Sequence, residues 1–376
     1  MPSTALLEPA GALVPGATRI AVLRSNSIGD FVVALPALEA LRAAYPDATI
    51  TYLGTTWHPA LLEGRPGSWD RVVVVPRYPG VRDEGEPARD SPQVRRFVAE
   101  QRAERYDLAV QLHGGGGNSN PFVAALGARV TAGSRDDGAP ALDRWTRYAH
   151  HQHEILRFLE VVGLVGAAPV TLEPRLAVTA ADRAAAAEAL GDDDAPLVAA
   201  HPGANDPRRR WAPESFAIVA QRLAELGARI VVVGHGPDDE QAAARIADSF
   251  DAAGADRPLD LVGRLGLGPM LGVLERCRLV VANDSGPRHL AAAVGAATVG
   301  VYWVGNLVNA GPLTRARHRV AVSFRVTCPA CGADPGQGRC PHDESFVDDV
   351  PVDDVLAAAL DLYANEEGRT AEPADR

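Results

Sequence analysis

Short apolar runs and stretches with helical spacing alternate along most of the chain. Residues 19–24 (RIAVLR) form an apolar run typical of a buried strand, and residues 25–30 (SNSIGD) form a turn. Residues 31–45 then place apolar side chains at helical intervals. Further apolar runs predict strands at residues 48–53, 71–75, 107–112 and 129–132. Strands that alternate with helices predict a parallel, doubly wound α/β sheet.

A second alternation of the same kind begins at Pro196. It predicts strands at residues 197–201, 228–234, 259–262, 279–282 and 298–302, and helices at residues 215–226, 241–250, 270–276 and 288–294. Residues 180–196, rich in Ala and Asp, break the rhythm, and we expect the connection between two α/β halves there. The expected organisation is a flexible leader (1–17), an N-terminal Rossmann-like domain (18–180), a C-terminal Rossmann-like domain (195–350), a C-terminal helix (351–364) and a frayed tail (365–376).

Composition narrows the class of protein. A chain of 376 residues suits two domains, since single domains commonly have roughly 100–150 residues. No apolar run approaches the ~18–20 residues of a membrane helix, and residues 1–17 lack the basic segment of a signal peptide. The net charge of −11 disfavours general nucleic-acid binding. Four cysteines fit a reducing compartment, so we expect a cytoplasmic protein.

The first candidate site is the loop Ser25–Asp30, between the first strand and the first helix. Gly29 is expected to permit a tight turn, and Ser27 and Gly29 to lie where an acceptor or an anion meets the helix start. Asp30 would place a carboxylate at the mouth of this site. The alternative is that Asp30 caps the helix, and the two roles are compatible.

The second candidate site is the loop His201–Trp211, which contains three consecutive arginines ahead of a helix. Guanidinium groups present planar donor forks that suit phosphate, and in an acidic protein their concentration indicates an anionic ligand. The alternative is a solvated basic loop. The position after a strand favours binding of a diphosphate.

A third loop, 281–290 (VANDSGPRHL), again joins a strand to a helix start. Free backbone N–H groups there would suit the phosphates of a nucleotide, with a histidine directed at the phosphate or the leaving oxygen, although a single histidine is more often structural. The candidate binding residues are Asn283, Asp284, Ser285, Gly286 and His289.

Weaker signals mark two more loops and a cysteine cluster. Gly234 and Glu240 would frame the nucleoside, with the acid accepting a ribose hydroxyl. His113 and Asn118 lie in a glycine-rich loop that would serve the acceptor side, a lid or flexibility alone. In a flap at 328–342, the spacing C-x₂-C-x₈-C-x-H suits a structural zinc ion, against free thiols or one disulfide; its members are Cys328, Cys331, Cys340 and His342.

Taken together, three phrases resemble glycosyltransferase family 9, the heptosyltransferase-like enzymes. They are Arg24-Ser-Asn-Ser-Ile-Gly-Asp30 followed by Leu35-Pro-Ala-Leu38, His201-Pro-Gly-Ala with Arg210-Trp211, and Asn283-Asp-Ser-Gly-Pro-Arg-His-Leu-Ala291. The resemblance covers roughly residues 18–360. Asn26 in place of a small hydroxyl residue and the glycine-rich loop depart from the family pattern on the acceptor side.

The resemblance implies a glycosyltransferase-B fold, with two Rossmann-like domains facing a cleft. Residues 18–180 would be the acceptor-side domain, and residues 195–350 would be the nucleotide-sugar-binding domain. The resemblance also implies an inverting transfer from a nucleoside-diphosphate sugar, ADP-linked by preference and with heptose as a candidate sugar, to a cell-envelope glycan or glycolipid. Asp30 would be the general base, Arg210 would bind the diphosphate, and no catalytic metal would be needed. The enzyme would be cytoplasmic or peripheral at the inner membrane face. Two alternatives are a sugar-nucleotide epimerase of the same fold and a non-catalytic nucleotide-binding or interaction protein.

Overall fold

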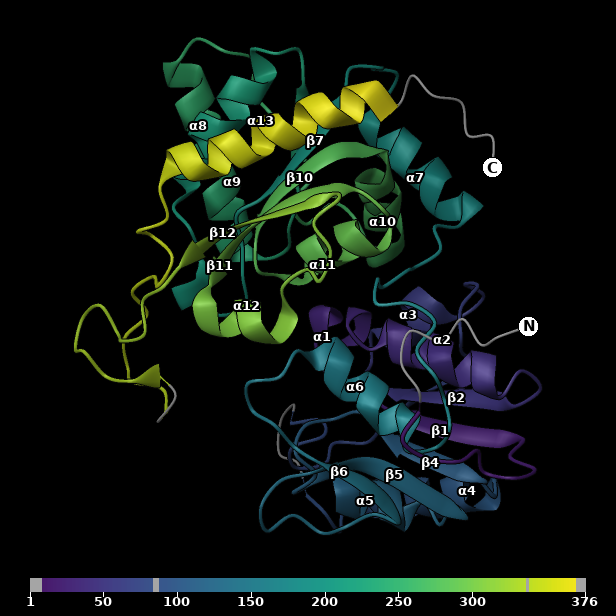
Figure 1. Ribbon diagram of the computed structural model, residues 1–376. Coiled ribbons are helices and arrows are strands. Elements are labelled where there is room, and N and C mark those ends of the chain that lie inside the picture. The colour runs from purple at the N-terminus through teal and green to yellow at the C-terminus, as the bar shows by residue number, and fades with distance from the viewer. Residues whose placement is uncertain (1–8, 84–87, 336–337, 370–376) are drawn as a thin grey trace. The chain divides into compact units, whose positions relative to one another are not determined.

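A computed structural model describes residues 9–83, 88–335 and 338–369, and the chain divides into two compact units, Met1–Ala177 and Val178–Arg376. Each unit contains a six-stranded sheet in which all adjacent strands are parallel. Figure 1 shows both sheets with helices packed around them. The prediction of a two-domain α/β fold is therefore confirmed.

The first unit has the strand order β3-β2-β1-β4-β5-β6. Its strands are β1 (Arg19–Leu23), β2 (Thr49–Gly54), β3 (Arg71–Val74), β4 (Leu108–Gln111), β5 (Val130–Arg135) and β6 (Arg144–Arg147). Its helices are α1 (Ile28–Val32), α2 (Leu35–Ala44), α3 (His58–Leu62), α4 (Pro92–Ala103), α5 (Ser119–Ala125) and α6 (Glu154–Gly163). Central β1 pairs with both β2 and β4, so four of its five residues are buried, as its apolar run predicts.

The second unit has the strand order β12-β11-β10-β7-β8-β9. Its strands are β7 (Leu197–His201), β8 (Arg229–Val232), β9 (Leu259–Asp260), β10 (Cys277–Asn283), β11 (Ala297–Trp303) and β12 (His318–Ser323). Its helices are α7 (Ala180–Leu190), α8 (Pro213–Ala224), α9 (Pro237–Ala252), α10 (Leu267–Arg276), α11 (Gly286–Ala293), α12 (Val304–Ala310) and α13 (Val352–Arg369), with a 3₁₀ turn η1 (Pro207–Arg209).

The two sheets have the same topology. Read from β9, the second order is β9-β8-β7-β10-β11-β12, which corresponds strand for strand to β3-β2-β1-β4-β5-β6. In the first unit the strands after β1 are therefore added toward one edge of the sheet as far as β3, and the chain then returns to add β4, β5 and β6 on the other side of β1. The same reversal occurs between β7 and β10 in the second unit. In open α/β sheets ligands bind beyond the carboxyl ends of strands at this reversal.

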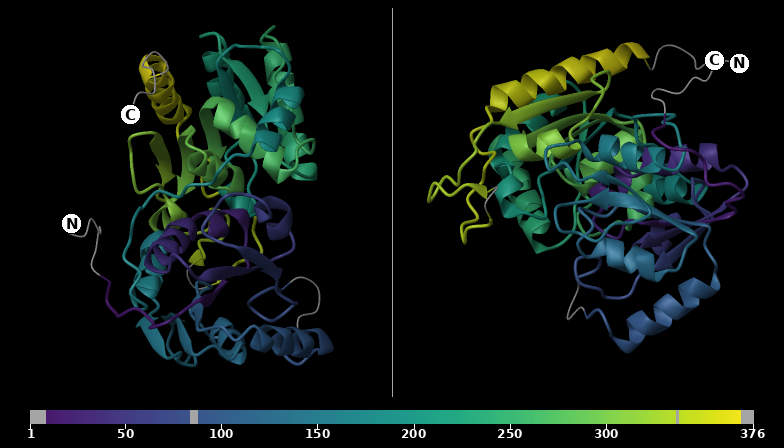
Figure 2. Two further views of the ribbon diagram at one scale, coloured as in Figure 1. Left: turned by 90° about the vertical axis from the view of Figure 1, so that its right-hand side faces the viewer. Right: turned by 60° about the horizontal axis from the view of Figure 1, so that its bottom comes forward.

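The core of the second unit supports the loops that follow β7 and β10. Helices α8, α9 and α13 contribute Phe216, Ile246 and Val355 to one buried cluster with the sheet. Helix α13 packs along β11 and β12, as the two views of Figure 2 show. On α10, a Cβ at Gly272 would lie 2.4 Å from the Asp182 carbonyl oxygen of α7. The absent side chain lets these two helices pack closely.

Several local predictions differ from the structure. The single helix predicted over residues 31–45 is two helices, α1 and α2, because Pro36 lacks a backbone N–H and begins a new helix. Residues 180–190 form helix α7 of the second unit instead of a connection, because Thr179 and Asp182 form a capping box. Helix α13 continues through residues 365–369 of the expected tail, and residues 370–376 lie outside the described part.

The expected flexible leader is packed where the structure describes it. Val14 is 2% exposed, and its N–H donates to the Tyr45 hydroxyl at 2.9 Å. The Gly11 N–H donates to the Gly163 carbonyl at 2.9 Å. Residues 9–17 are thus part of the first unit, and residues 1–8 lie outside the described residues.

Candidate active site

Asp30 lies at the carboxyl end of β1, in the first turn of α1. Its Oδ1 accepts a hydrogen bond from Arg24 Nη2 at 2.5 Å, and its Oδ2 accepts from the Ser27 hydroxyl at 2.7 Å. The Ser27 backbone N–H also donates to Oδ2, at 3.2 Å. Ser27 is therefore the N-cap, and Asp30 bonds back to it from the third helical position. Gly29 lies inside α1 and is not among the glycines with a positive φ, so no tight turn depends on it.

Arg24 connects Asp30 to a second, half-buried acid, Glu154, which was not among the residues predicted from the sequence. Arg24 is 3% exposed, and its Nη2 lies 3.1 Å from Glu154 Oε2 at the start of α6. Its Nη1 donates to the Leu112 carbonyl at 2.9 Å, and the guanidinium lies over the Phe158 ring. Glu154 also pairs with buried Arg157. This network holds the Arg24 guanidinium in one orientation.

Two opposing effects act on the Asp30 carboxyl group. Burial by itself raises the pKa of an acid, because it disfavours the charged form. The Arg24 guanidinium and the hydrogen bonds from Ser27 outweigh burial and hold the pKa of Asp30 below its ordinary value. About a third of the side chain (34%) stays exposed, so the carboxylate is both ionised and accessible at neutral pH.

The glycine-rich loop after β4 lies beside Asp30. His113 is buried, and its Nδ1 accepts the Ser25 N–H at 3.2 Å. Burial, together with the nearby Arg24 charge, lowers the pKa of His113 to about 4, so this histidine is neutral at pH 7. Buried Gln111 spans the loop by donating to the carbonyls of His113 and Gly114, at 2.8 and 3.0 Å.

Asn118 does not cap α5, since its Oδ1 accepts a hydrogen bond from Arg89. Arg89 lines a pocket of about 680 Å³ between α4 and α5 in the same unit. The pocket combines an apolar lining, which includes Val94, Val98 and Phe122, with one acid, Asp90, and two further arginines, Arg95 and Arg102. A surface of this kind suits an amphipathic anionic molecule.

In the second unit, the arginine loop (residues 206–210) follows β7, and its three arginines have different partners. Arg208 Nη2 lies 2.6 Å from Asp206 Oδ2 within the loop. Arg209 Nη1 lies 3.2 Å from Asp284 Oδ2 in the loop after β10. Arg210 donates from Nε to the Ala204 carbonyl at 2.9 Å, and its Nη2 lies 2.9 Å from Asp238.

The Asp284–Gly286 segment leads into α11. Asp284 is 4% exposed, and burial by itself raises its pKa. The hydrogen bond and charge of His289, together with Arg288 and Asn306, outweigh burial and lower the pKa of Asp284 well below its ordinary value. Ser285, the N-cap of α11, makes no side-chain cap; its Oγ lies 2.9 Å from His201 Nδ1. The first-turn N–H groups are therefore not covered by this hydroxyl.

His289 is buried in this segment. Its Nε2 lies 3.4 Å from Asp284 Oδ1, and Arg288 Nη2 lies 2.6 Å from its Nδ1. Arg288 is 2% exposed, packs over the Tyr302 ring, and leaves its Nε without a partner among the described residues. Arg288 therefore adds a buried positive charge at the start of α11, and its side chain was not among the site residues predicted from the sequence.

Asn283 has a structural role that joins the two loops. Its Nδ2 donates to the Pro202 carbonyl at 2.6 Å, and its Oδ1 accepts the Trp211 backbone N–H at 3.1 Å. The indole N–H of Trp211 donates to the Val350 carbonyl at 3.0 Å. Asn283 therefore fixes the two ends of the His201–Trp211 loop.

After β8, the buried acid in the first turn of α9 is Asp239 and not Glu240. Asp239 Oδ2 accepts the His235 N–H at 2.8 Å and lies 3.5 Å from His201 Nε2, whereas Glu240 is exposed. A Cβ at Gly234 or Gly203 would lie 2.4 or 1.9 Å from an Asp239 carboxylate oxygen. Both glycines are thus required by close packing against this acid.

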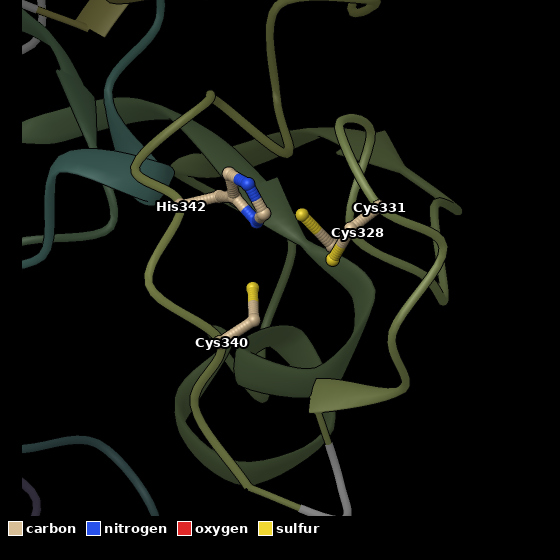
Figure 3. Close-up of side chains that lie close together, drawn as sticks. All are labelled: Cys328, Cys331, Cys340 and His342. Atoms are coloured by element: carbon tan, nitrogen blue, oxygen red, sulfur yellow. The ribbon is translucent and has the colours of Figure 1, made fainter.

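The Cys328–His342 flap brings its four candidate ligands together. One ligand atom from each of Cys328, Cys331, Cys340 and His342 lies within 4.8 Å of all the others. Figure 3 shows the three sulfurs and the imidazole pointing into a common space. All four cysteines of the chain are free thiols, so the alternative of a disulfide is not what the structure shows.

Comparisons with known proteins agree with this architecture. The sequence model of glycosyltransferase family 9 (heptosyltransferase) matches residues 94–331. Lipopolysaccharide heptosyltransferase 2 of Salmonella typhimurium is 25% identical over 296 residues, which cover 76% of this chain and 82% of that protein. Since the family model spans more than half of the chain, the chain belongs to glycosyltransferase family 9 and is a glycosyltransferase.

Solved structures share the fold, which is of the glycosyltransferase-B type as the resemblance implied. A family 9 glycosyltransferase from Veillonella parvula superposes with a TM-score of 0.74 at 23% identity, covering 96% of this chain and 100% of that one. The E. coli ADP-heptose lipopolysaccharide heptosyltransferase II superposes with a TM-score of 0.69 at 20% identity, covering 93% and 99%. Among the described residues, no helix combines the length and apolar character needed to cross a membrane.

Proposed function

We propose that this enzyme transfers heptose from ADP-heptose to a lipopolysaccharide-type glycolipid, with inversion at the anomeric carbon. The relative in Salmonella and the E. coli structure carry the names of heptosyltransferases of lipopolysaccharide, and the E. coli name includes ADP-heptose. The observation in this chain that supports the proposal is the ionised, partly exposed carboxylate of Asp30 at the carboxyl end of β1.

Asp30 is the proposed general base. One of its carboxylate oxygens accepts the proton of the acceptor hydroxyl while the hydroxyl oxygen forms a bond to the anomeric carbon. The bond from that carbon to the β-phosphate oxygen breaks, and ADP leaves with the electron pair. Arg24 positions the carboxylate through Oδ1, and Ser27 holds Oδ2. A carboxylate has about four lone-pair positions, so room remains for the proton.

The arginine loop and the start of α11 are the proposed diphosphate site. Arg209 and Arg210 provide guanidinium groups, and the N–H groups of Ser285, Gly286 and Arg288 provide donors at a helix start. His289 and Asp284 shape the site, and Gly234 and Glu240 border the nucleoside. Positive charge from arginine stabilises the leaving ADP, so the proposed chemistry needs no catalytic metal.

The pocket between α4 and α5 is the proposed binding surface for the anionic part of the acceptor. Arg89, Arg95 and Arg102 would pair with acidic groups, while Val98 and Phe122 contact apolar parts. Of the segment between β4 and α5, His113 lies near Asp30 and Asn118 contacts the pocket residue Arg89. A lipid-linked acceptor would bring the enzyme to the cytoplasmic face of the inner membrane.

Thermal unfolding with ADP, UDP, GDP, dTDP and NAD tests the donor class. A nucleotide at about 100 times its Kd stabilises the native state by about 2.7 kcal/mol. We expect ADP alone to raise Tm strongly; a shift with NAD or UDP only would contradict the proposal. Transfer from ADP-heptose to heptose-deficient lipopolysaccharide, without added Mg²⁺, then tests the reaction. The anomeric configuration of the product, determined by NMR, tests inversion.

A further inference from the structure

We propose that Cys328, Cys331, Cys340 and His342 bind one zinc ion, and that this ion holds the arginine loop in its binding conformation. The first part concerns the metal alone. The second part rests on the proposed function, because it assigns that loop to the diphosphate of the donor.

The ligand set fits zinc in type and number. Three thiols and one imidazole provide four soft or borderline donors, the composition of a closed structural zinc site. At a tetrahedral zinc, thiolate sulfurs lie about 3.8 Å apart, given Zn–S distances of about 2.3 Å. The four ligand atoms already lie within 4.8 Å of one another, so small side-chain rotations complete the geometry.

The turn that carries the first two cysteines is already shaped for a metal. The Cys328 N–H donates to the Ala333 carbonyl, and the Gly332 N–H donates to the Cys328 carbonyl, both at 2.8 Å. Gly332 has φ +72°, which favours glycine there. These contacts fix the backbone that carries the two thiols.

The imidazole supplies a second, independent observation. The Nδ1 atom of His342 is buried and has no hydrogen-bond partner among the described residues. A buried polar atom without a partner costs about 1–3 kcal/mol, and a metal ligand bond would satisfy it. Figure 3 shows this ring directed toward the three sulfurs.

The flap is joined to the arginine loop on the far side of His342. The Phe346 N–H donates to the Arg208 carbonyl at 2.7 Å, and the Ser345 hydroxyl donates to the Arg210 carbonyl at 2.6 Å. In the segment between Cys331 and Cys340, Arg339 Nη1 lies 3.3 Å from Asp206 Oδ1 of the arginine loop. The backbone on both sides of Arg209 is thus fixed by residues that follow the cluster within four positions.

The flap has little apolar packing of its own. Cys331, Gly332 and Asp334 are exposed, and only Cys328 is buried among the four ligands. A segment of this kind gains little from hydrophobic burial and is commonly stabilised by a metal. With four protein ligands the zinc has no open position, so it is structural and takes no part in the transfer.

The test measures metal content and ADP affinity of the full-length enzyme, purified under reducing conditions. We expect about one zinc per chain by elemental analysis, and less than a tenth of that in Cys340→Ser and His342→Ala. His150→Ala, at an exposed histidine outside the flap, is the matched control and retains the metal. About one iron per chain, or no metal with three freely titrating flap thiols, would overturn the zinc assignment.

Replacement by Co²⁺ provides a readout that does not depend on the variants folding. Cobalt in the wild-type enzyme should show thiolate-to-metal charge transfer and the intense bands of a tetrahedral site. Cobalt spectra of octahedral, oxygen-ligated type would contradict the proposed ligands.

The second part is measured as the Kd of ADP. The two ligand variants should bind ADP about two- to tenfold more weakly, the effect of losing a neutral hydrogen bond that positions the loop. Unchanged ADP affinity in a metal-free variant would reject the positioning role while leaving the zinc site in place. Failure of the wild-type enzyme to bind ADP would instead reject the proposed function, and the metal analysis would stand separately.

Discussion

Arg24 and Asp30 form an ion pair inside a single strand–helix loop, with 2.5 Å between Nη2 and Oδ1. The arginine is 3% exposed, whereas the Asp30 side chain is 34% exposed. The buried Arg24 guanidinium therefore fixes one carboxylate oxygen of the more exposed Asp30. This relationship keeps the carboxylate charged and oriented without covering it.

Replacing Asp30 by Asn tests the general base. Asn keeps the shape of the side chain but does not accept a proton, so kcat should fall at least ~10²-fold. ADP affinity should stay near the wild-type value, because the proposed donor site belongs to the second unit. Steady-state kinetics and calorimetric titration with ADP measure the two effects. Asp47→Asn, at an exposed aspartate of the same unit, is the control. A folded Asp30→Asn enzyme with full activity would rule out the assignment.

The pH dependence of Arg24→Met tests the electrostatic role of the arginine. Burial raises the pKa of Asp30 and Arg24 lowers it, so removing the guanidinium should raise that pKa. The base works only when ionised, and kcat/KM is lost as pH falls through its pKa. The acid limb of the kcat/KM profile should therefore move to higher pH in Arg24→Met. Arg71→Met, which removes a surface ion pair with Glu104, should leave it in place. Identical acid limbs in Arg24→Met and wild type would contradict the pairing.

Substitutions of the consecutive arginines separate their roles. Arg209 contacts Asp284 in the loop before α11, and Arg210 contacts exposed Asp238. We expect Arg209→Ala to weaken ADP binding by about 10–100-fold, the effect of a lost charged hydrogen bond. Arg210→Ala should also weaken binding, by a smaller factor. Arg222→Ala on α8, whose partner Glu225 lies on the surface, should leave the Kd of ADP unchanged. Wild-type affinity in Arg209→Ala would show that the diphosphate binds elsewhere.

Gly272→Ala tests the close contact between α7 and α10. Alanine is the better helix former by about 1 kcal/mol, so in an isolated helix the change would stabilise. Here the new Cβ would lie 2.4 Å from a backbone oxygen of Asp182, and overpacking costs about 1–3 kcal/mol. A net fall in the free energy of unfolding is expected from denaturant titration. Gly117→Ala has open space and no positive φ, so its stability should change little. A stabilised Gly272→Ala protein would show that the helices separate readily.

The apolar pattern was a good guide to the central strands and to the loops that follow them. Strand β7 occupies the residues predicted for it, and the three phrases that indicated family 9 lie after β1, β7 and β10. The family and the enzyme class are confirmed. Edge strand β6 was missed because its residues, RWTR, are polar and only partly buried.

The pattern of apolar and polar residues does not predict which distant side chains contact each other. Arg24 and Glu154 are 130 residues apart, and Arg209 and Asp284 are 75 residues apart, so only the folded sheet brings them together. The order Arg208-Arg209-Arg210 carries no periodicity that tells which guanidinium turns toward Asp284. The assignments of site residues from sequence stay predictions until the variants are measured.

The identical strand order of the two units has a consequence for how such enzymes diversify. The reversal of strand order occurs once in each unit, with an acid in the segment after the first strand of one unit and arginines after the first strand of the other. Each segment is supported by the buried core of its own unit. If Asp30 serves the acceptor and the arginines serve the nucleotide, as proposed, substitutions around the acid would change the choice of acceptor while the packing behind the arginines stays intact.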